Sequence, residues 1–293
     1  MTPGRIAAAL ALVAASAVLH AAWNLLAKRV PSELPFVWLA SATTSVLFLP
    51  AAAVTAGIER PVFGWQQLSF VLLSGGLHAV YFLSLQRGYR DGDLSIVYPI
   101  ARGTGALLAA IAAIWLLGEG TDTLSIAGIV LVVGGVFALT GGGHALRGGT
   151  FATGAEWGLL TGAAIASYTL TDRRSVTTLG IPPLVVFPLT QLALTALLTP
   201  SAWRRRAEVA GVWRDHRRTI VAVSVISATA YLLVLTALTF APVSYVAPAR
   251  ELSIVVAVLL GARVLGEVDV RRRLVAAGAV SAGVVALTIG LAA

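Results

Sequence analysis

Ten apolar segments, each long enough to cross a lipid bilayer, follow one another along this chain of 293 residues. In the first half they cover 5–27, 35–57, 65–86, 94–117 and 123–140. In the second half they cover 155–175, 182–202, 219–240, 243–265 and 274–291. Strand-like alternation is absent, and backbone groups in lipid must pair within a segment. The pattern therefore predicts an all-α polytopic membrane protein with ten transmembrane helices.

The scarcity of charged residues excludes several other classes of protein. Only 12% of the residues are charged, whereas soluble domains average about 25%. This composition is unlike that of a soluble enzyme, a disordered chain or a nucleic-acid-binding domain, so we expect no nucleic-acid partner. The net charge of +8 comes mainly from arginines at the ends of apolar segments, which is typical of membrane topology signals. Without cysteine, the chain has no disulfide and no thiolate metal site.

The N-terminus resembles a secretory signal peptide, because Met1 to Arg5 precede an apolar run that ends near His20. Nine further apolar segments follow it. We therefore expect the first segment to stay in the protein as a transmembrane helix. The expected location is the cell membrane, as a multi-pass protein in contact with the lipid bilayer.

The two halves of the chain resemble each other at an offset near 148 residues. Gly118-Glu119 matches Gly266-Glu267, and Tyr81 falls opposite Tyr231. The run from Gly135 to Thr140 matches the run from Gly283 to Thr288, and the run from Ser95 to Pro99 matches that from Ser244 to Pro248. Arg102 falls opposite Arg250 after a slip of one residue. We therefore divide the chain into two five-helix repeats, 1–143 and 144–293.

Five is an odd number, so the second repeat must begin on the opposite side of the membrane from the first. The two repeats are therefore expected to be inverted relative to each other. Inverted repeats are common in secondary transporters, which bind substrate near the midplane between the repeats.

Several local patterns make the chain resemble the EamA-type transporters of the drug/metabolite transporter superfamily. These are His20-Ala21-Ala22-Trp23-Asn24 with Lys28, the run from Gly92 to Gly103, Leu117-Gly118-Glu119, Leu265-Gly266-Glu267, and the run from Tyr168 to Asp172. The similarity covers about 5–291. It implies ten helices in two five-helix repeats and transport of small polar metabolites without ATP. It does not specify a substrate.

Charged residues inside apolar segments are the strongest candidates for a site. Arg102 and Arg250-Glu251 lie well inside their segments, where an unpaired charge costs at least about 2.5–3.5 kcal/mol. One interpretation is that the arginines contact an anion or carboxylate, with Glu251 as their partner or as a proton carrier. The other is a structural ion pair that locks the two halves. The sequence leaves both open.

Prolines at equivalent places in the two repeats predict helix kinks beside these charges. Pro99 and Pro248 precede the two arginines, and Gly103 further loosens the fourth segment. Paired interruptions at corresponding positions of two halves indicate a binding site.

Other polar and aromatic residues inside the segments are candidates for lining a substrate cavity. His78 and Tyr81 share one helix face, and so do Tyr168 and Asp172. The complete set of predicted substrate-binding residues is Arg102, Tyr98, Arg250, Glu251, His78, Tyr81, Tyr231, His20, Asn24 and Tyr168. Proton coupling through Glu251, Asp172 or a histidine is left open.

Two small-residue pairs, Gly134 with Ala138 and Gly278 with Ala282, are spaced for close helix contact. Packing within one chain and a homodimer contact are both compatible with them.

The charged stretch 203–218 is interpreted as a cytoplasmic loop, with an anionic-lipid site as the alternative. If the connections after odd-numbered segments share one side, that side carries 15 cationic residues and the other carries four. The positive-inside rule then places both termini outside the cytoplasm, whereas the family resemblance implies termini inside.

These observations together favour a secondary transporter, expected to be an exporter of a small polar or amphipathic metabolite such as an amino acid-like or drug-like compound. We expect no enzyme activity, because the chain has no Walker A motif, no His-Glu-x-x-His pair and no cysteine nucleophile. No cofactor or metal is expected either. The alternatives are an intramembrane enzyme or a flippase that acts on a lipid-linked substrate.

Overall fold

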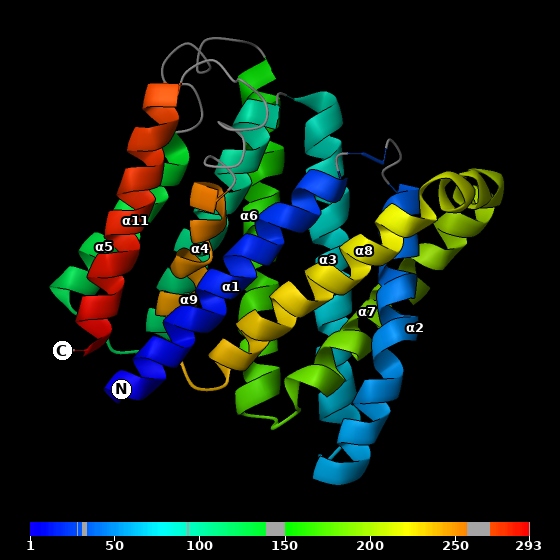
Figure 1. The fold of residues 1–293 in the computed structure, drawn as a ribbon, viewed down its shortest axis with the longest axis horizontal. Helices are drawn as coiled ribbons and strands as arrows, with labels where there is room; N and C mark the ends of the chain where they lie inside the picture. Colours follow the sequence, from blue (N-terminus) through cyan, green and yellow to red (C-terminus); the bar gives the residue numbers. More distant parts are fainter. Residues whose placement is uncertain (28, 31–33, 93, 139–149, 257–269, 293) are drawn as a thin grey trace.

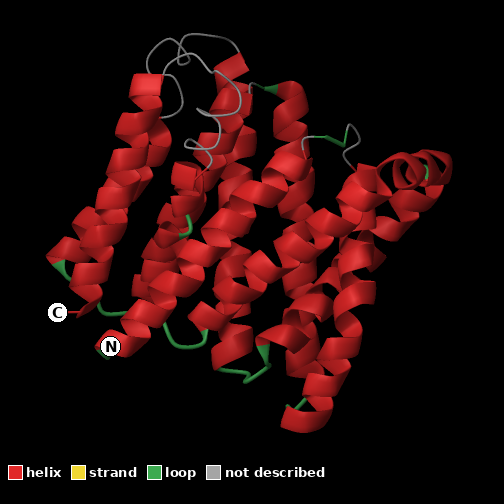
Figure 2. Cartoon of the chain, viewed as in Figure 1, coloured by secondary structure: helices red, strands yellow, loops and turns green. Residues whose placement is uncertain are grey.

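The computed structural model describes the whole chain except residues 28, 31–33, 93, 139–149, 257–269 and 293. All regular secondary structure in the described part is helical (Figure 2). The first half contains α1 (Pro3–Ala27), α2 (Leu34–Glu59), α3 (Trp65–Asp91), α4 (Leu94–Leu116) and α5 (Thr123–Ala138). The second half contains α6 (Thr150–Thr177), α7 (Pro183–Arg204), α8 (Arg206–Leu238), α9 (Val243–Ala249) and α11 (Val270–Ala292).

Seven of the described helices are long and apolar enough to cross a membrane. They are α1, α2, α3, α4, α7, α8 and α11. The ten-span prediction is therefore confirmed only as a multi-pass helical membrane protein. Helix α5 has 16 residues, α6 contains charged residues such as Asp172 and Arg173, and α9 ends after seven residues. Length and charge thus explain why these three helices do not qualify.

The prediction of a loop over 203–218 is wrong. Helix α7 continues to Arg204, and α8 begins at Arg206 and runs for 33 residues. The charged stretch is therefore the first part of a long helix, and the two helices join with almost no connection. The start of α8 lies at the end of the bundle opposite to both chain termini (Figure 1). The prediction of a loop rested on the loss of apolar residues in this stretch. Arginine has a high helix propensity, so a charged stretch rich in arginine can be helical.

Where a helix of one half packs on a helix of the other half, the equivalents of these two helices in the sequence repeat also pack on each other, which we call an exchanged pattern. Helix α1 packs on α8, and its equivalent α6 packs on α3. Likewise α2 packs on both α7 and α8, while α7 packs on α3. The pairs α2–α7, α4–α9 and α5–α11 join equivalent helices directly. A two-fold relation between the halves would produce this pattern of contacts.

The contact between α5 and α11 depends on glycines. A Cβ added at Gly135 would come within 2.9 Å of the carbonyl oxygen of Ala276. A Cβ added at Gly283 would come within 2.7 Å of the carbonyl oxygen of Gly128. At the repeat offset, these two contacts are equivalent to each other. Only glycine lets the two backbones approach so closely.

The prediction that the two small-residue pairs mediate helix packing within the chain is wrong, and their use in a homodimer stays a prediction. A Cβ added at Gly134 or at Gly278 would meet nothing within 4 Å. The packed face of α5 instead carries Gly128 and Gly135, which are buried. A shift of one residue turns a helix face by about 100°, so adjacent glycines such as Gly134 and Gly135 face different surroundings.

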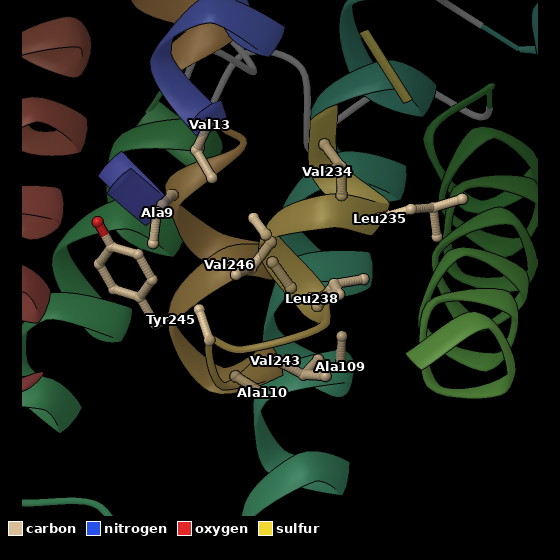
Figure 3. Close-up of a cluster of buried hydrophobic side chains, with 14 of the residues drawn as sticks. Ala9, Val13, Ala109, Ala110, Val234, Leu235, Leu238, Val243, Tyr245 and Val246 are labelled. Carbon is tan, nitrogen blue, oxygen red and sulfur yellow. The ribbon is translucent and has the colours of Figure 1, made fainter. Parts of the chain in front are cut away.

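A buried apolar core holds α1, α4, α8 and α9 together. Figure 3 shows Val13 of α1, Ala109 of α4, Leu238 of α8 and Val246 of α9 in this cluster. All four side chains are fully buried. On the outside of the molecule, large apolar residues are exposed, including Val46, Ile58 and Trp115. Exposed apolar side chains along apolar helices are expected where lipid is the solvent.

Some predictions concern residues outside the described part of the chain. The boundary between the predicted repeats at 143–144, Lys28, and the second copy of the motif, Gly266-Glu267, all lie there. The division into 1–143 and 144–293 stays a prediction.

Candidate functional site

A cavity of about 120 Å³ lies between the two halves of the chain. Helices α1, α2 and α3 line it from the first half, and α6, α7 and α8 line it from the second. By the repeat offset, these are three pairs of equivalent helices. The cavity thus lies where sequence reasoning expected a substrate site, between the repeats.

Aromatic side chains form much of the cavity wall. They are Trp23, Phe36, Tyr81, Phe82, Tyr168, Phe187 and Tyr231. The His78 ring stacks on the Tyr168 ring with centroids 4.1 Å apart, and Tyr231 meets Phe187 at 5.2 Å. Aromatic faces offer a large apolar contact area together with polar tips. Such a wall suits a ligand with an apolar or aromatic body.

Arg250 brings the positive charge into this cavity. It follows the last residue of α9, two positions after Pro248, and its guanidinium lies 5.5 Å from the centroid of the Tyr231 ring. The charged residues that line the cavity, within the described part, include no carboxylate. No ion pair found among the described residues involves Arg250. Its guanidinium therefore keeps hydrogen-bond donors for an anionic ligand.

Arg102 is equivalent to Arg250 in the repeat but has a different environment. Its Nε donates to Glu251 Oε2 at 3.0 Å, and a terminal nitrogen lies 2.9 Å from Oε1. The same terminal nitrogen donates to Ser253 Oγ at 3.3 Å. Both charged side chains are buried. The pair joins α4 of the first half to the segment after α9, and neither residue lines the aromatic cavity.

Asp172 does not line the cavity itself but is hydrogen-bonded to Tyr231, which does. Its Oδ1 accepts a hydrogen bond of 2.5 Å from the Ser74 hydroxyl, and its Oδ2 accepts one from the Tyr231 hydroxyl. Nδ1 of His78 lies 2.9 Å from the backbone oxygen of Ser74. The structure therefore brings His78, Tyr231 and Tyr168 together around one buried carboxyl group, with Tyr81 beside Tyr168 at a centroid distance of 5.9 Å.

The other predicted site residues lie around this cluster. His20 lines the cavity and accepts a hydrogen bond of 3.3 Å from the Trp23 ring nitrogen at its Nδ1. Asn24 donates to the backbone oxygen of His20, and neither Asn24 nor Tyr98 lines the cavity. Their predicted contact with substrate stays a prediction.

The predicted kink positions differ between the two halves. Helix α4 continues through Pro99 and Gly103, whereas α9 ends at Ala249, directly after Pro248. A Cβ added at Gly103 would lie 3.0 Å from the Phe137 ring, so this glycine provides room for a neighbouring helix. The helical break in the second half places Arg250 at a helix end, next to the cavity.

Sequence reasoning missed three residues with clear roles in this arrangement. Ser74 looks like an ordinary helix serine, although it lies four residues before His78 on the same face. Phe187 and Gln191 line the cavity from α7. Phe187 looks like a lipid-facing residue, whereas the polar amide of Gln191 inside an apolar segment was a usable signal for an interior position. Their roles depend on which helices meet, and a single sequence does not specify this.

The carboxylate of Glu119, in the motif used to detect the repeat, binds the start of α9. Its Oε1 accepts the backbone N–H of Val243 at 2.8 Å, and its Oε2 accepts that of Ser244 at 2.9 Å. The Ser244 hydroxyl donates to the same Oε2. These bonds satisfy free N–H groups at a helix start, where a negative charge is favourable. Glu119 thereby fixes the helix that leads to Arg250.

A second carboxylate caps α5 outside the apolar segments. The backbone N–H of Ser125 donates to Asp122 Oδ1 at 2.6 Å, and this hydrogen bond lowers the pKa of the Asp122 carboxyl below its usual value. Among the residues that the structure describes, no group of histidine, aspartate and glutamate side chains is arranged to hold a metal ion.

Several apolar membrane-spanning helices around an internal cavity define a multi-pass membrane protein. Residues 152–289 match the EamA-like transporter family. This match confirms the resemblance to EamA-type transporters and shows that the second half of the chain carries a domain of a membrane-transporter family.

Comparison with solved structures gives 29 matching chains. One, described as "Crystal structure of protein", superposes with a TM-score of 0.73 at 17% sequence identity, over 97% of this chain and 97% of the other. At this identity the likeness shows a shared fold over nearly the whole length. Comparison with curated proteins gives no significant match.

Proposed function

We propose that this protein is a secondary transporter that exports a small amphipathic metabolite with an anionic group. The family match supports transport, and export is the direction of transport that we propose. The observation that carries the substrate class is Arg250, a cation in an aromatic cavity that forms no ion pair with a carboxylate of the described residues. Arginine binds carboxylates through a planar fork of donors, while aromatic walls receive the apolar body.

We place substrate contacts at Arg250, His78, Tyr81, Tyr168, Tyr231 and His20, which line the cavity. Arg102 and Glu251 then act as a structural pair between the halves rather than as substrate ligands. The exchanged pairing of equivalent helices supports two inverted repeats that rock around the cavity to give alternating access. In this scheme the hydrogen bonds of Glu119 to the start of α9 couple movement of the α4–α5 connection to movement of α9 and Arg250.

Counterflow in proteoliposomes tests the proposal. Vesicles loaded with unlabelled phenylpyruvate should transiently accumulate labelled phenylpyruvate without ATP. Unlabelled phenylpyruvate should compete better than phenylalanine, which adds an ammonium group, and much better than phenethylamine, which has no carboxylate. Chromatography of the vesicle contents should recover the probe unchanged.

Protein-free vesicles and vesicles with Arg250→Ala are the controls. Competition by phenethylamine equal to that by phenylpyruvate would contradict the anionic substrate class. Conversion of the probe into a product without flux would favour the alternative of an intramembrane enzyme.

A further inference from the structure

Asp172 has a buried carboxyl group, and a hydroxyl group is hydrogen-bonded to each of its two oxygens. Both of its oxygens accept hydroxyl hydrogens, one from Ser74 and one from Tyr231. Asp172 is 2% exposed, and Ser74 is fully buried. A buried carboxylate in a membrane protein is costly and usually marks a function such as proton transfer.

The hydrogen bond of His78 to the backbone fixes which of its ring nitrogens is free. Nδ1 lies 2.9 Å from the carbonyl oxygen of Ser74, and a carbonyl oxygen only accepts hydrogen bonds. Nδ1 therefore carries a hydrogen, and in the neutral ring Nε2 is the atom that can take a proton. The Ser74 hydroxyl lies 3.4 Å from Nδ1 and also donates to Asp172, so it joins the imidazole to the carboxylate.

The other titratable and charged groups around the cavity and this pair come from several helices. They are Tyr81 on α3, Tyr168 on α6, Tyr231 on α8, His20 on α1, Arg250 after α9, and Arg102 on α4 with its partner Glu251. From α7, the described cavity residues are Phe187, Gln191 and Leu194, none of which titrates. Tyr231 and His78 are therefore the titratable residues that line the cavity and are linked to the buried carboxyl group, Tyr231 directly and His78 through the Ser74 hydroxyl.

The charges in and behind the cavity balance when it is empty. Arg102 and Glu251 neutralise each other, and the remaining pair of opposite charges is Arg250 and Asp172. An anionic substrate adds one negative charge to this interior. An uncompensated charge in the membrane interior is unfavourable, whereas one added proton restores neutrality. We propose that His78 and Asp172, joined by Ser74, bind this proton and that the protein moves one proton together with each substrate anion.

Side-chain contacts connect the proposed proton-binding residues to Arg250, the proposed substrate ligand. The Arg250 guanidinium lies over the Tyr231 ring, and the Tyr231 hydroxyl donates to Asp172. Anion binding at Arg250 thus affects Tyr231, the residue whose hydroxyl is hydrogen-bonded to the Asp172 carboxylate. In this proposal the proton enters from water on the open side, resides on His78 Nε2, and leaves on the other side with the anion. No bond of the substrate changes.

This inference rests on the proposed function, and proteoliposomes that contain a trapped pH indicator separate the two. An inward gradient of phenylpyruvate should acidify the lumen, and its uptake should not respond to an imposed membrane potential. Uptake without acidification, or uptake slowed by a negative interior, would overturn the proton coupling while leaving the transporter intact. Absence of counterflow would instead overturn the proposed function.

Variants then test whether the proton belongs to this pair. Asp172→Asn and His78→Gln should abolish acidification and make any remaining phenylpyruvate uptake sensitive to membrane potential. Asp122→Asn changes a carboxyl at a helix start that does not line the cavity, so it should retain wild-type coupling. Wild-type acidification in both Asp172→Asn and His78→Gln would overturn the assignment.

Ser74→Ala keeps the proposal testable if those variants do not fold. Without the serine hydroxyl, the carboxylate stabilises the protonated imidazole less, so the pH profile of uptake should shift to more acidic pH. An unchanged pH profile in Ser74→Ala would show that the serine does not join the two groups, which would contradict the proposal.

Discussion

Two arginines that occupy equivalent places in the repeat have different roles at the residue scale. Arg102 faces Glu251 in a bidentate ion pair, while Arg250 lies over an aromatic ring at the cavity. The sequence identified both, because arginine inside an apolar segment is rare. It left their roles open, because the partner of each depends on packing between distant helices. The structure gives Arg102 a buried carboxylate partner and places Arg250 at the cavity, and the roles proposed for them follow from these different surroundings.

Removing the cavity arginine should weaken substrate binding without unfolding the protein. A hydrogen bond to a charged group contributes about 1.5–3 kcal/mol, so Arg250→Ala should raise the half-saturating phenylpyruvate concentration by about 10- to 100-fold. Arg250→Lys should recover part of the loss, because it keeps the charge without the fork of donors. Flux titrations measure this. Arg90→Ala, in an exposed ion pair, is the matched control.

An unchanged half-saturating concentration in Arg250→Ala, with wild-type melting, would show that the substrate does not use this cation.

Removing the paired arginine should instead reduce stability. Arg102→Ala leaves Glu251 as a buried charge without its partner, which typically destabilises by about 3–5 kcal/mol. The double variant Arg102→Ala/Glu251→Ala should regain much of this stability, because no unpaired charge remains. Thermal melting of the purified protein in detergent gives the comparison. A double variant less stable than both single variants would contradict a simple ion pair.

At the scale of helices, the sequence located most elements but not their register. The predicted segments 35–57 and 94–117 agree closely with α2 and α4, because apolar length sets the ends of membrane helices. The early start of α8 was missed, because a charged amphipathic helix and a charged loop look alike in hydropathy. The contact face of α5 was missed by one residue, because Gly134 has a small residue, Ala138, four positions later, whereas Gly135 has Leu139 there.

Adjacent glycines on α5 provide a matched pair of variants. Gly135→Leu inserts a side chain against the backbone of α11 and should destabilise the protein by about 1–3 kcal/mol or more. Gly134→Leu faces open space and should melt close to the wild type. Equal melting temperatures for the two variants would contradict the described packing of α5 on α11.

At the scale of the whole molecule, the repeat was the most informative feature of the sequence. An odd number of helices in each half predicted inversion, and equivalent helices pair in an exchanged pattern. The cavity between the halves followed from the same reasoning. Its aromatic wall was predicted only in part, since residues such as Phe187 contribute through tertiary contacts.

The orientation in the membrane stays a prediction, because the charge count favours termini outside the cytoplasm and the family resemblance implies termini inside. Cysteines at Thr2 and Ala210 provide clean labelling sites, because the chain has no native cysteine. The positive-inside rule predicts that Thr2→Cys reacts with an impermeant maleimide on intact cells, whereas Ala210→Cys reacts only after permeabilisation. The reverse pattern would place the termini in the cytoplasm and refute the orientation.

Alternating access of the cavity is the central claim, and one labelling measurement tests it most directly. Ser227 lines the cavity from α8, so Ser227→Cys reports which side of the membrane reaches it. In sealed right-side-out and inside-out vesicles, an impermeant maleimide should label Ser227→Cys from both sides, while Ala210→Cys is labelled from one side only. Excess phenylpyruvate should protect Ser227→Cys in both preparations. Labelling from a single side, with or without phenylpyruvate, would contradict transport through this cavity.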